Sequence, residues 1–328
     1  MTPSRRLASL ATRRIRLVAI LSAVVLATLG TVAFVSFNQE PPQPGGTSDS
    51  HGDPDIGLRT FVVPDDVTVT ENVAYGARPD GTLLQLDVCS SSAAGPAPRP
   101  AVVSIHGGSW TRGDKASDDW REVCEWLASE GFVAYSVDYG LTPAAPFPSG
   151  IDDLQTAVEW IRSPENANRF GIDGDRIGAF GGSAGGNLAS LLGTRGEGPL
   201  TEGPRVAAVA ELSGPSDLRG PSMAADGVSP RLKKLVMGYL DCEKLNDCPN
   251  AADASPVAEL DASDGPVFLA NSSKEFVPLE QATRFTSALE DLDIRHELVT
   301  VPGDVHSIGL LDAEMRARVA AFLHEALD

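Results

Sequence analysis

Short apolar runs alternate with amphipathic segments along most of this 328-residue chain. Two early stretches, VTVTENVAY and LLQLDVCS, predict an antiparallel pair that opens a sheet. Six later runs are rich in β-branched residues and predict strands buried on both faces, because such strands are apolar along their whole length. These six runs are AVVSIHG, FVAYSVDY, RIGAFGG, VAAVAELS, PVFLANS and RHELVTV.

Segments with helical periodicity lie between these predicted strands. Apolar positions recur every three or four residues in DDWREVCEWLASEG, DDLQTAVEWIRS, NLASLLGT, LEQATRFTSALEDL and DAEMRARVAAFLHEAL. Strands that alternate with helices are typical of βαβ units. The sequence therefore predicts an α/β protein with an eight-stranded, mostly parallel sheet flanked by helices.

The N-terminal part of the chain has a different pattern. Residues 1–16 are basic, and the uncharged apolar run at 17–37 is long enough to cross a bilayer as a helix. The apolar run of a cleaved signal peptide is shorter, so we expect a membrane anchor with the rest of the protein outside the cytoplasm. A secreted protein is the alternative. Residues 38–57 predict a flexible linker, and residues 58–328 a single folded domain.

A long segment interrupts the alternation of strands and helices. Residues 214–264 are rich in Gly, Pro, Ser and Asp and contain one helical candidate, RLKKLVMGYL. Insertions of this length beside a sheet often cover a binding pocket. We therefore expect residues 214–264 to shape a substrate pocket.

The net charge limits the binding partners that the protein is expected to have. The formal net charge of −19 disfavours binding to nucleic acid, whose phosphates would repel the protein.

An even number of cysteines in an exported protein indicates disulfides, and four cysteines allow three pairings. We expect Cys242 to pair with Cys248 across a short polar loop, and Cys89 with Cys124. The sequence contains no Cys-x-x-Cys motif or Cys/His cluster, so we expect no metal site.

The sequence GGSAGG at 181–186 places Ser183 between a predicted strand and a predicted helix. A serine on such a sharp turn has its hydroxyl exposed above the sheet, as a nucleophile requires. The free N–H groups at the start of the helix favour an anion that forms nearby. The alternative interpretation is a glycine-rich turn without chemistry.

A second glycine-rich stretch, HGGSW at 106–110, directly follows another predicted strand. The backbone N–H groups of Gly107 and Gly108, together with that of Ala184, predict an oxyanion hole. The alternative is an ordinary loop after a strand.

His306 is the candidate general base. Of the five histidines, it alone lies in a predicted loop at the carboxyl end of the sheet, where open α/β sheets bind their ligands. Glu275 follows the strand PVFLANS and is the preferred acid to orient His306. Asp217, in the loop after the preceding strand, is the alternative acid. Either choice gives the chain order serine, acid, histidine.

With these residues in place, the chain from about Val67 to the C-terminus resembles the α/β-hydrolase superfamily. The resemblance is to the esterase and lipase branch that includes hormone-sensitive-lipase-like and bacterial feruloyl-esterase-like enzymes. It rests on HGGSW, VDYGLTPAAPFPSGIDDLQTAVEWI, ENANRFGIDGDRIGAFGGSAGGNLA, DASPVAEL and VPLEQATRF. Two positions depart from the family pattern: relatives often carry Arg at the position of Gly140, and the usual Asp is Lys274, followed by Glu275.

The resemblance implies an eight-stranded α/β-hydrolase fold, no metal or organic cofactor, and hydrolysis of carboxylic esters. Trp110 and Phe147 are expected to line the pocket together with the insertion. The expected substrate is a small-molecule ester, or a polysaccharide or lipid ester outside the cell. The alternatives are a serine peptidase, a lipase, or a binding protein that has lost its catalytic function.

Overall fold

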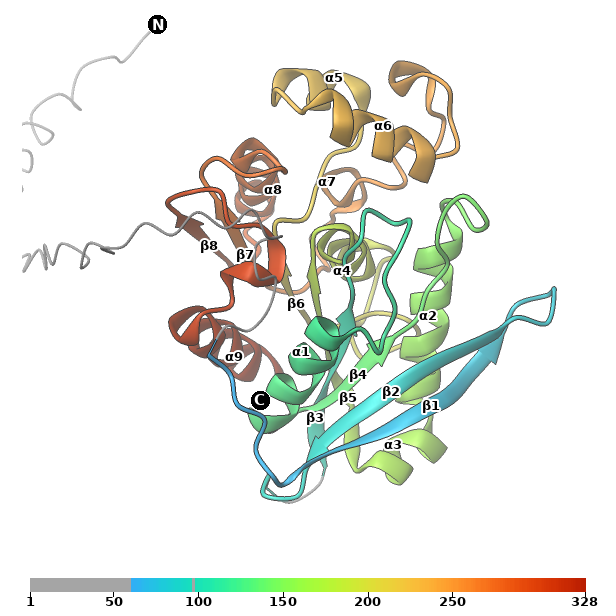
Figure 1. Cartoon of the computed structure of the whole chain (residues 1–328), viewed down its shortest axis with the longest axis vertical. Coiled ribbons are helices and arrows are strands. Elements are labelled where there is room, and N and C mark those ends of the chain that lie inside the picture. Colours follow the sequence, from blue (N-terminus) through green and yellow to red (C-terminus); the bar gives the residue numbers. More distant parts are fainter. Residues whose placement is uncertain (1–59, 96–97) are drawn as a thin grey trace, which may run out of the picture. The chain divides into compact units, whose positions relative to one another are not determined.

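Eight strands form one sheet in the computed structural model, which describes residues 60–95 and 98–328 (Figure 1). The strand order is β1-β2-β4-β3-β5-β6-β7-β8. Strand β2 is antiparallel to both of its neighbours, and all other neighbouring pairs are parallel. The predicted eight-stranded, mostly parallel sheet is therefore confirmed. The strands are β1 (Val67–Ala77), β2 (Leu83–Ser91), β3 (Arg99–Ile105), β4 (Val133–Val137), β5 (Ile172–Gly182), β6 (Ala208–Leu212), β7 (Val267–Ser272) and β8 (His296–Val301).

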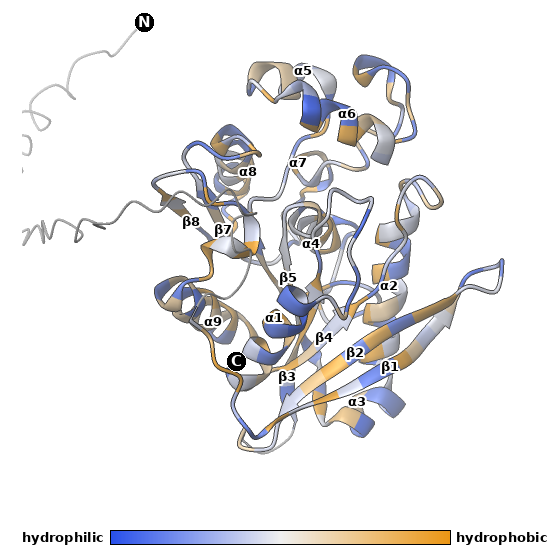
Figure 2. Ribbon diagram, viewed as in Figure 1, coloured by the Kyte–Doolittle hydropathy of each residue, from blue (hydrophilic) through white to orange (hydrophobic). Residues whose placement is uncertain are grey.

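Helices cover both faces of the sheet, so the core has two layers. Alternate residues of a strand enter opposite layers: Ala179 packs in the layer that contains α2, α4 and α8, and Phe180 in the layer that contains α1 and α9. In Figure 2, α1, α2 and α9 carry both hydrophilic and hydrophobic stretches, as amphipathic helices do. The helices are α1 (Asp118–Ser129), α2 (Ser149–Arg162), α3 (Pro164–Phe170), α4 (Ala184–Thr194), α8 (Leu279–Asp291) and α9 (Ala313–Leu327).

Aromatic side chains fill the layer beneath α1. Trp126 and Phe180 are fully buried, and their rings meet edge to face at 5.7 Å. Burial of one such side chain contributes about 2–3 kcal/mol to stability. This packing fixes β5, the strand that leads to Ser183.

The insertion between β6 and β7 is folded into short helices. It contains α5 (Gly220–Ala225), α6 (Pro230–Tyr239), the 3-10 turn η1 (Leu245–Asp247) and α7 (Pro256–Glu259). In Figure 1, α5 and α6 lie together at the top of the view. An ion pair between Asp226 and Arg284, and a 2.7 Å hydrogen bond from Gln281 Nε2 to Asp226 Oδ2, attach the insertion to α8.

Both disulfides match the expected pairing. Cys89 of β2 is bonded to Cys124 of α1, with 5.8 Å between their Cα atoms. Cys242 is bonded to Cys248, with 5.4 Å between their Cα atoms. The first disulfide attaches α1 to the sheet, and the second closes the turn after α6.

The expected membrane anchor at 17–37 lies outside the described residues, as do the basic segment at 1–16 and the linker at 38–57. In the part of the chain that the structure describes, no helix combines the length and the apolar character needed to span a bilayer.

Candidate active site

Ser183 occupies a sharp turn between β5 and α4. Its φ is 57°, and its N–H donates to the carbonyl oxygen of Leu212 at 2.8 Å. A Cβ atom on Gly181 would lie 2.1 Å from the oxygen of Gly185, and one on Gly185 would lie 2.0 Å from the oxygen of Ile105. The turn therefore requires glycine at both positions, as the sequence indicated.

The structure brings His306 and Glu275 to Ser183. The Nε2 atom of His306 lies 2.9 Å from Ser183 Oγ, and its Nδ1 atom is hydrogen-bonded to Glu275 Oε2. The Glu275 side chain is completely buried, whereas the His306 side chain is 30% exposed. Glu275 Oε1 accepts hydrogen bonds from the N–H of Ser272 at 2.7 Å and from Ser213 Oγ at 2.8 Å. The three side chains thus form one continuous hydrogen-bonded chain.

Asp217, the alternative acid, is bound elsewhere. Its Oδ1 accepts from Arg219 Nε at 2.8 Å, and its Oδ2 accepts from Arg219 Nη2 at 2.6 Å. Burial alone would raise the pKa of Asp217, but the hydrogen bonds from Arg219 outweigh it and hold the pKa below its usual value. The structure therefore brings Glu275, and not Asp217, into contact with His306.

The loop after β3 lies against the serine turn. A Cβ atom on Gly107 would lie 3.5 Å from Ser183 Cβ, and Gly108 has a φ of +116°, which favours glycine. Among the described residues, the N–H groups of Gly107 and Gly108 donate to no other group. The N–H of Ala184, the first residue of α4, has no acceptor within its own helix. Backbone donors are therefore free on both sides of the serine.

His106 supports this loop and takes no part in the hydrogen-bonded chain. Its ring stacks on Tyr139 at 4.3 Å, and Tyr139 Oη donates to the carbonyl oxygen of His106 at 2.7 Å. Burial lowers the pKa of His106, so the ring is neutral and its Nδ1–H donates to the Gly107 oxygen at 2.8 Å. His106 thus fixes the orientation of the Gly107 peptide.

Trp110 and Phe147 meet through a third aromatic residue, Tyr239 of α6. The Trp110 and Tyr239 rings stack at 4.4 Å, and Phe147 meets Tyr239 edge-on at 5.7 Å. The N–H of Phe147 also donates to the carbonyl oxygen of Tyr239 at 2.9 Å. Sequence analysis assigned a pocket to the insertion but missed Tyr239. The available signal was an aromatic residue at the end of the helical pattern RLKKLVMGYL.

Three more residues that sequence analysis missed lie at or beside the hydrogen-bonded chain. Phe276 follows Glu275 and meets the His306 ring edge-on at 5.9 Å. Arg231 of α6 lies over the Phe276 ring at 5.4 Å, so the insertion approaches the histidine. Ser213, next to the end of β6, bonds to Glu275 but stands in no motif.

Gly140 departs from the family pattern, and the structure shows what fills its surroundings. A Cβ atom there would lie 2.8 Å from Arg78 Nη2 and 3.2 Å from Asp153 Oδ2. Arg78 forms an ion pair with Asp153, and the N–H of Gly140 donates to Asp153 Oδ2 at 2.8 Å. A guanidinium from the turn between β1 and β2 therefore lies beside position 140.

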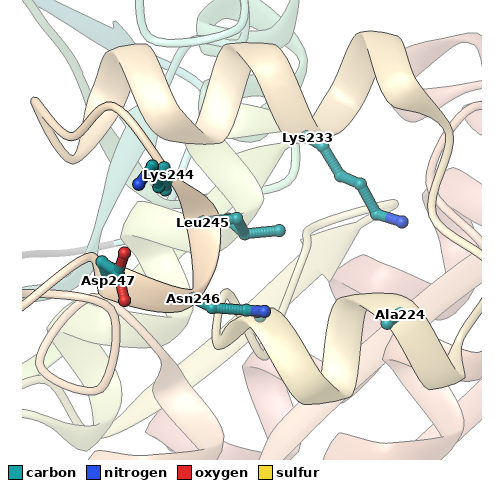
Figure 3. Close-up of a pocket in the computed structure, with 7 residues that line it drawn as sticks. Ala224, Lys233, Lys244, Leu245, Asn246 and Asp247 are labelled. Atoms are coloured by element: carbon teal, nitrogen blue, oxygen red, sulfur yellow. The ribbon is translucent and has the colours of Figure 1, made fainter.

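A cavity of about 460 Å³ lies within the insertion, between α5, α6 and η1 (Figure 3). Figure 3 shows the side chains of Lys233 and Leu245 extending into it. Neither Ser183 nor His306 lines this cavity, so it is separate from the serine site. The cavity is lined by Gly220, Ala224, Lys233, Lys244, Leu245, Asn246 and Asp247.

Within residues 60–95 and 98–328, no three His, Cys, Asp or Glu side chains are grouped so that they would hold a metal ion. The groups gathered at Ser183 are a hydroxyl, an imidazole, a carboxylate and backbone amides. This set is suited to acyl transfer.

The chain is similar to mycobacterial esterases. It is 30% identical over 255 residues to esterase LipC of Mycobacterium tuberculosis, and 28% identical over 262 residues to esterase LipQ of the same organism. These alignments cover 73% and 77% of this chain and 60% of each relative. The chain therefore spans about three fifths of the length of these relatives.

Solved structures share the fold. A truncated carbohydrate esterase from gut microbiota superposes with a TM-score of 0.66 at 20% identity, over 79% of this chain and 96% of the other. The apo form of Thermogutta terrifontis esterase 2 superposes with a TM-score of 0.64 at 24% identity, over 80% and 95%. Residues 86–289, more than half of the chain, match the family BD-FAE. The chain therefore belongs to the BD-FAE family and has the α/β-hydrolase fold.

Proposed function

We propose that this protein is a serine esterase that hydrolyses carboxylic esters with Ser183, His306 and Glu275. The observation that carries the proposal is the continuous set of hydrogen bonds from Ser183 Oγ through the imidazole to the buried Glu275 carboxylate. The esterases LipC and LipQ are relatives that support the assignment.

The reaction proceeds in two halves. Ser183 Oγ attacks the ester carbonyl carbon while His306 Nε2 accepts the hydroxyl proton. The C–O bond to the alcohol then breaks, and His306 returns the proton to the departing alcohol, which leaves an acylated serine. A water molecule attacks the acyl carbon, His306 takes its proton, and the acid departs as the proton returns to Ser183. Glu275 holds Nδ1 protonated and stabilises the imidazolium in both halves.

The backbone amides of Gly107, Gly108 and Ala184 stabilise the oxyanion of each tetrahedral intermediate. Each amide is fixed before the reaction, by the stacked His106 in the loop and by the helix start at Ala184. Removal of one such donor typically raises the barrier by about 3 kcal/mol. These amides stabilise the negative charge that develops on the carbonyl oxygen in the transition state, and not the neutral carbonyl of the bound ester.

Trp110, Phe147 and Tyr239 form the aromatic wall, which we propose as one side of the substrate pocket. All three are buried, and their stacking leaves little freedom to rearrange. We propose small-molecule esters and the short acyl groups of polysaccharide esters as substrates. Lipid esters and peptides are the competing classes.

We also propose that residues 17–37 anchor the protein in a membrane, with the domain at 58–328 outside the cytoplasm. The length of the apolar run and the arginines before it support this topology. Two disulfides in the folded domain fit an oxidising compartment. A secreted form is the alternative location.

The decisive experiment replaces Ser183. The variant Ser183→Ala loses hydrolysis of a short-chain nitrophenyl ester and labelling by a fluorophosphonate probe, because no nucleophile remains. Its melting temperature stays near that of the parent protein, which shows that the fold is intact. Ester hydrolysis at the parental rate by this variant would refute the proposal.

A second pair of variants tests the acid. Glu275→Gln lowers kcat by on the order of 10³- to 10⁴-fold, because His306 loses the acceptor that fixes its tautomer. Asp217→Asn leaves kcat little changed, because Asp217 bonds to Arg219 and not to the histidine. The reverse result would assign the acid to Asp217.

A substrate panel tests the competing enzyme classes. Cleavage of peptides but not esters would identify a peptidase. A steep rise in rate above the critical micelle concentration of the substrate would identify a lipase.

A further inference from the structure

Ser213 lies immediately after β6, where three strand ends meet. It is completely buried, and its N–H donates to the oxygen of Ala270 in β7 at 2.8 Å. Its φ of 57° places it in the left-handed region, which is unusual for a residue other than glycine. The neighbouring Gly214 donates its N–H to Glu211 Oε2 at 2.6 Å, which fixes the turn that follows. The backbone at Ser213 is therefore held on both sides.

The Ser213 hydroxyl connects the acid with the segment that carries the base. It donates to Glu275 Oε1 at 2.8 Å and accepts from the N–H of Ser307 at 2.9 Å. Ser307 is the residue directly after His306, and it is also buried. One oxygen atom thus binds both the Glu275 carboxylate and the backbone beside the imidazole.

Other contacts hold these loops, but none of them replaces this connection. The N–H of Ser272 also donates to Glu275 Oε1, at 2.7 Å, yet this bond stays within the turn that follows β7. Ser272 Oγ donates to the oxygen of Val305 at 2.6 Å and so joins the two loops without touching the carboxylate through its hydroxyl. The Ser213 hydroxyl, in contrast, bonds directly to the Glu275 carboxylate and to the Ser307 amide.

We propose that Ser213 is a positioning residue for the triad: its hydroxyl fixes the Glu275 carboxylate and the Ser307 amide in the arrangement that aims His306 Nε2 at Ser183. This inference rests on the proposed esterase function and goes beyond it. Ser213 itself is completely buried, and its hydroxyl is bonded to Glu275 and Ser307. Its effect on the rate passes through Glu275 and His306.

Two variants test this role. Ser213→Ala removes the hydroxyl and leaves the Ser307 amide without its acceptor, so kcat falls by about 10- to 100-fold, as expected when a reacting group is displaced slightly. KM stays within about twofold, because the change is not at the substrate pocket. Ser213→Gly suits the left-handed backbone better than alanine. An equal loss in this variant therefore assigns the effect to the hydroxyl and not to backbone strain.

The matched control is Ser104→Ala. Ser104 of β3 is completely buried, and its hydroxyl has no hydrogen-bond partner among the described residues. The same substitution in the same sheet therefore removes no bond. We expect kcat of this variant to stay within about twofold of the parent value.

Labelling by a fluorophosphonate probe separates positioning from a general loss of structure. A folded variant with a misaligned triad reaches the parental stoichiometry of labelling but does so more slowly, because every molecule still carries Ser183. A variant that is merely less folded labels a smaller fraction of its molecules.

Three outcomes would overturn the proposal. One is a kcat within about twofold of the parent in both Ser213 variants. Another is a loss of rate that is matched by an equal loss in the fraction of molecules labelled by the probe. The third is that both variants unfold, which would make Ser213 a structural residue only. The proposed function fails separately, through a fully active Ser183→Ala.

Discussion

Ser183 and Ser213 both have a positive φ of 57°, and they follow the ends of neighbouring strands. A positive φ costs a residue other than glycine about 1–3 kcal/mol. The sheet compensates for the cost by giving each N–H a partner on the next strand, Leu212 for Ser183 and Ala270 for Ser213. Glycines on both sides of Ser183 made the first turn predictable. Ser213 has glycine on one side only, so nothing in the sequence marked it.

The choice between two acids shows what the sequence could not settle. Chain order allowed both Glu275 and Asp217, since both follow strands that end at the same edge. The bidentate contact of Arg219 with Asp217 decides the matter, and it depends on side-chain conformation within a loop. Loop conformations of this kind leave no periodic signal in a sequence.

Glu211 gives a prediction for the pH dependence of stability. Burial raises its pKa from 4.5 to about 8. Between these values the unfolded chain releases the proton while the folded protein keeps it, so the folded state loses relative stability as the pH rises and levels off above about 8. Glu211→Gln abolishes this loss and keeps an acceptor for the Gly214 N–H. We expect the variant to gain a few kcal/mol over the parent between pH 5 and pH 8.

Denaturant unfolding of both proteins at several pH values measures this gain. Near pH 3.5, about one unit below the pKa of 4.5 in the unfolded chain, the two curves should lie close together, because Glu211 is then largely protonated in both states. A constant difference at every pH would show that Glu211 is ionised in the folded protein.

At the scale of elements, the sequence predicted where the insertion between β6 and β7 lies, but of its helices it predicted only one. Its longest helix, α6, appeared as a helical pattern because ten residues are enough to show periodicity. Helices α5 and α7, of six and four residues, are too short for that. The ion pair between Asp226 and Arg284 joins residues far apart in the chain, so no local pattern announces it.

Tyr239 should limit the length of the acyl group. Its ring fills the space between Trp110 and Phe147, and Tyr239→Ala opens that space. We expect the ratio of kcat/KM for a hexanoyl ester to that for an acetyl ester to rise about tenfold, because added methylene groups find apolar contacts. Steady-state kinetics with a series of nitrophenyl esters measures this ratio.

The matched control is Tyr135→Ala. Tyr135 of β4 is equally buried but packs on Phe170 of α3, away from the aromatic wall. The Tyr135→Ala variant should lose stability but keep the parental ratio of kcat/KM for the hexanoyl and acetyl esters. An unchanged ratio in Tyr239→Ala would remove Tyr239 from the pocket.

At the scale of the whole molecule, the alternation of strands and helices predicted the sheet, its strand number and its mostly parallel character. The strand order was not predictable, because β3 lies between β4 and β5 through crossovers that depend on packing. Lateral neighbours in a sheet are chosen by contacts between distant segments. Only the ends of strands, where Gly107, Ser183 and His306 lie, follow from the pattern itself.

The disulfide between Cys89 and Cys124 should contribute substantially to global stability. It closes a loop with a sequence separation of 35 residues, for which the loss of chain entropy in the unfolded state corresponds to about 3–4 kcal/mol. Replacing both cysteines with serine should lower the free energy of unfolding by that amount. Replacing Cys242 and Cys248, which are separated by 6, should cost about 2 kcal/mol.

Urea unfolding of the two double variants beside the parent protein tests this order. Equal losses, or a larger loss for the shorter loop, would contradict it. Activity should persist in both variants at temperatures where they remain folded.

The pairing of Arg78 with Asp153 beside Gly140 has a consequence for comparing sequences within the family. A search that asks only whether position 140 is arginine would score this chain as lacking that charge. The charge is present but comes from the first hairpin, some sixty residues earlier in the chain. An arginine placed at 140 would compete with Arg78 for the same space and the same carboxylate. Positions 78 and 140 should therefore vary together within the family, so that a guanidinium lies beside this carboxylate whichever of the two positions carries the arginine.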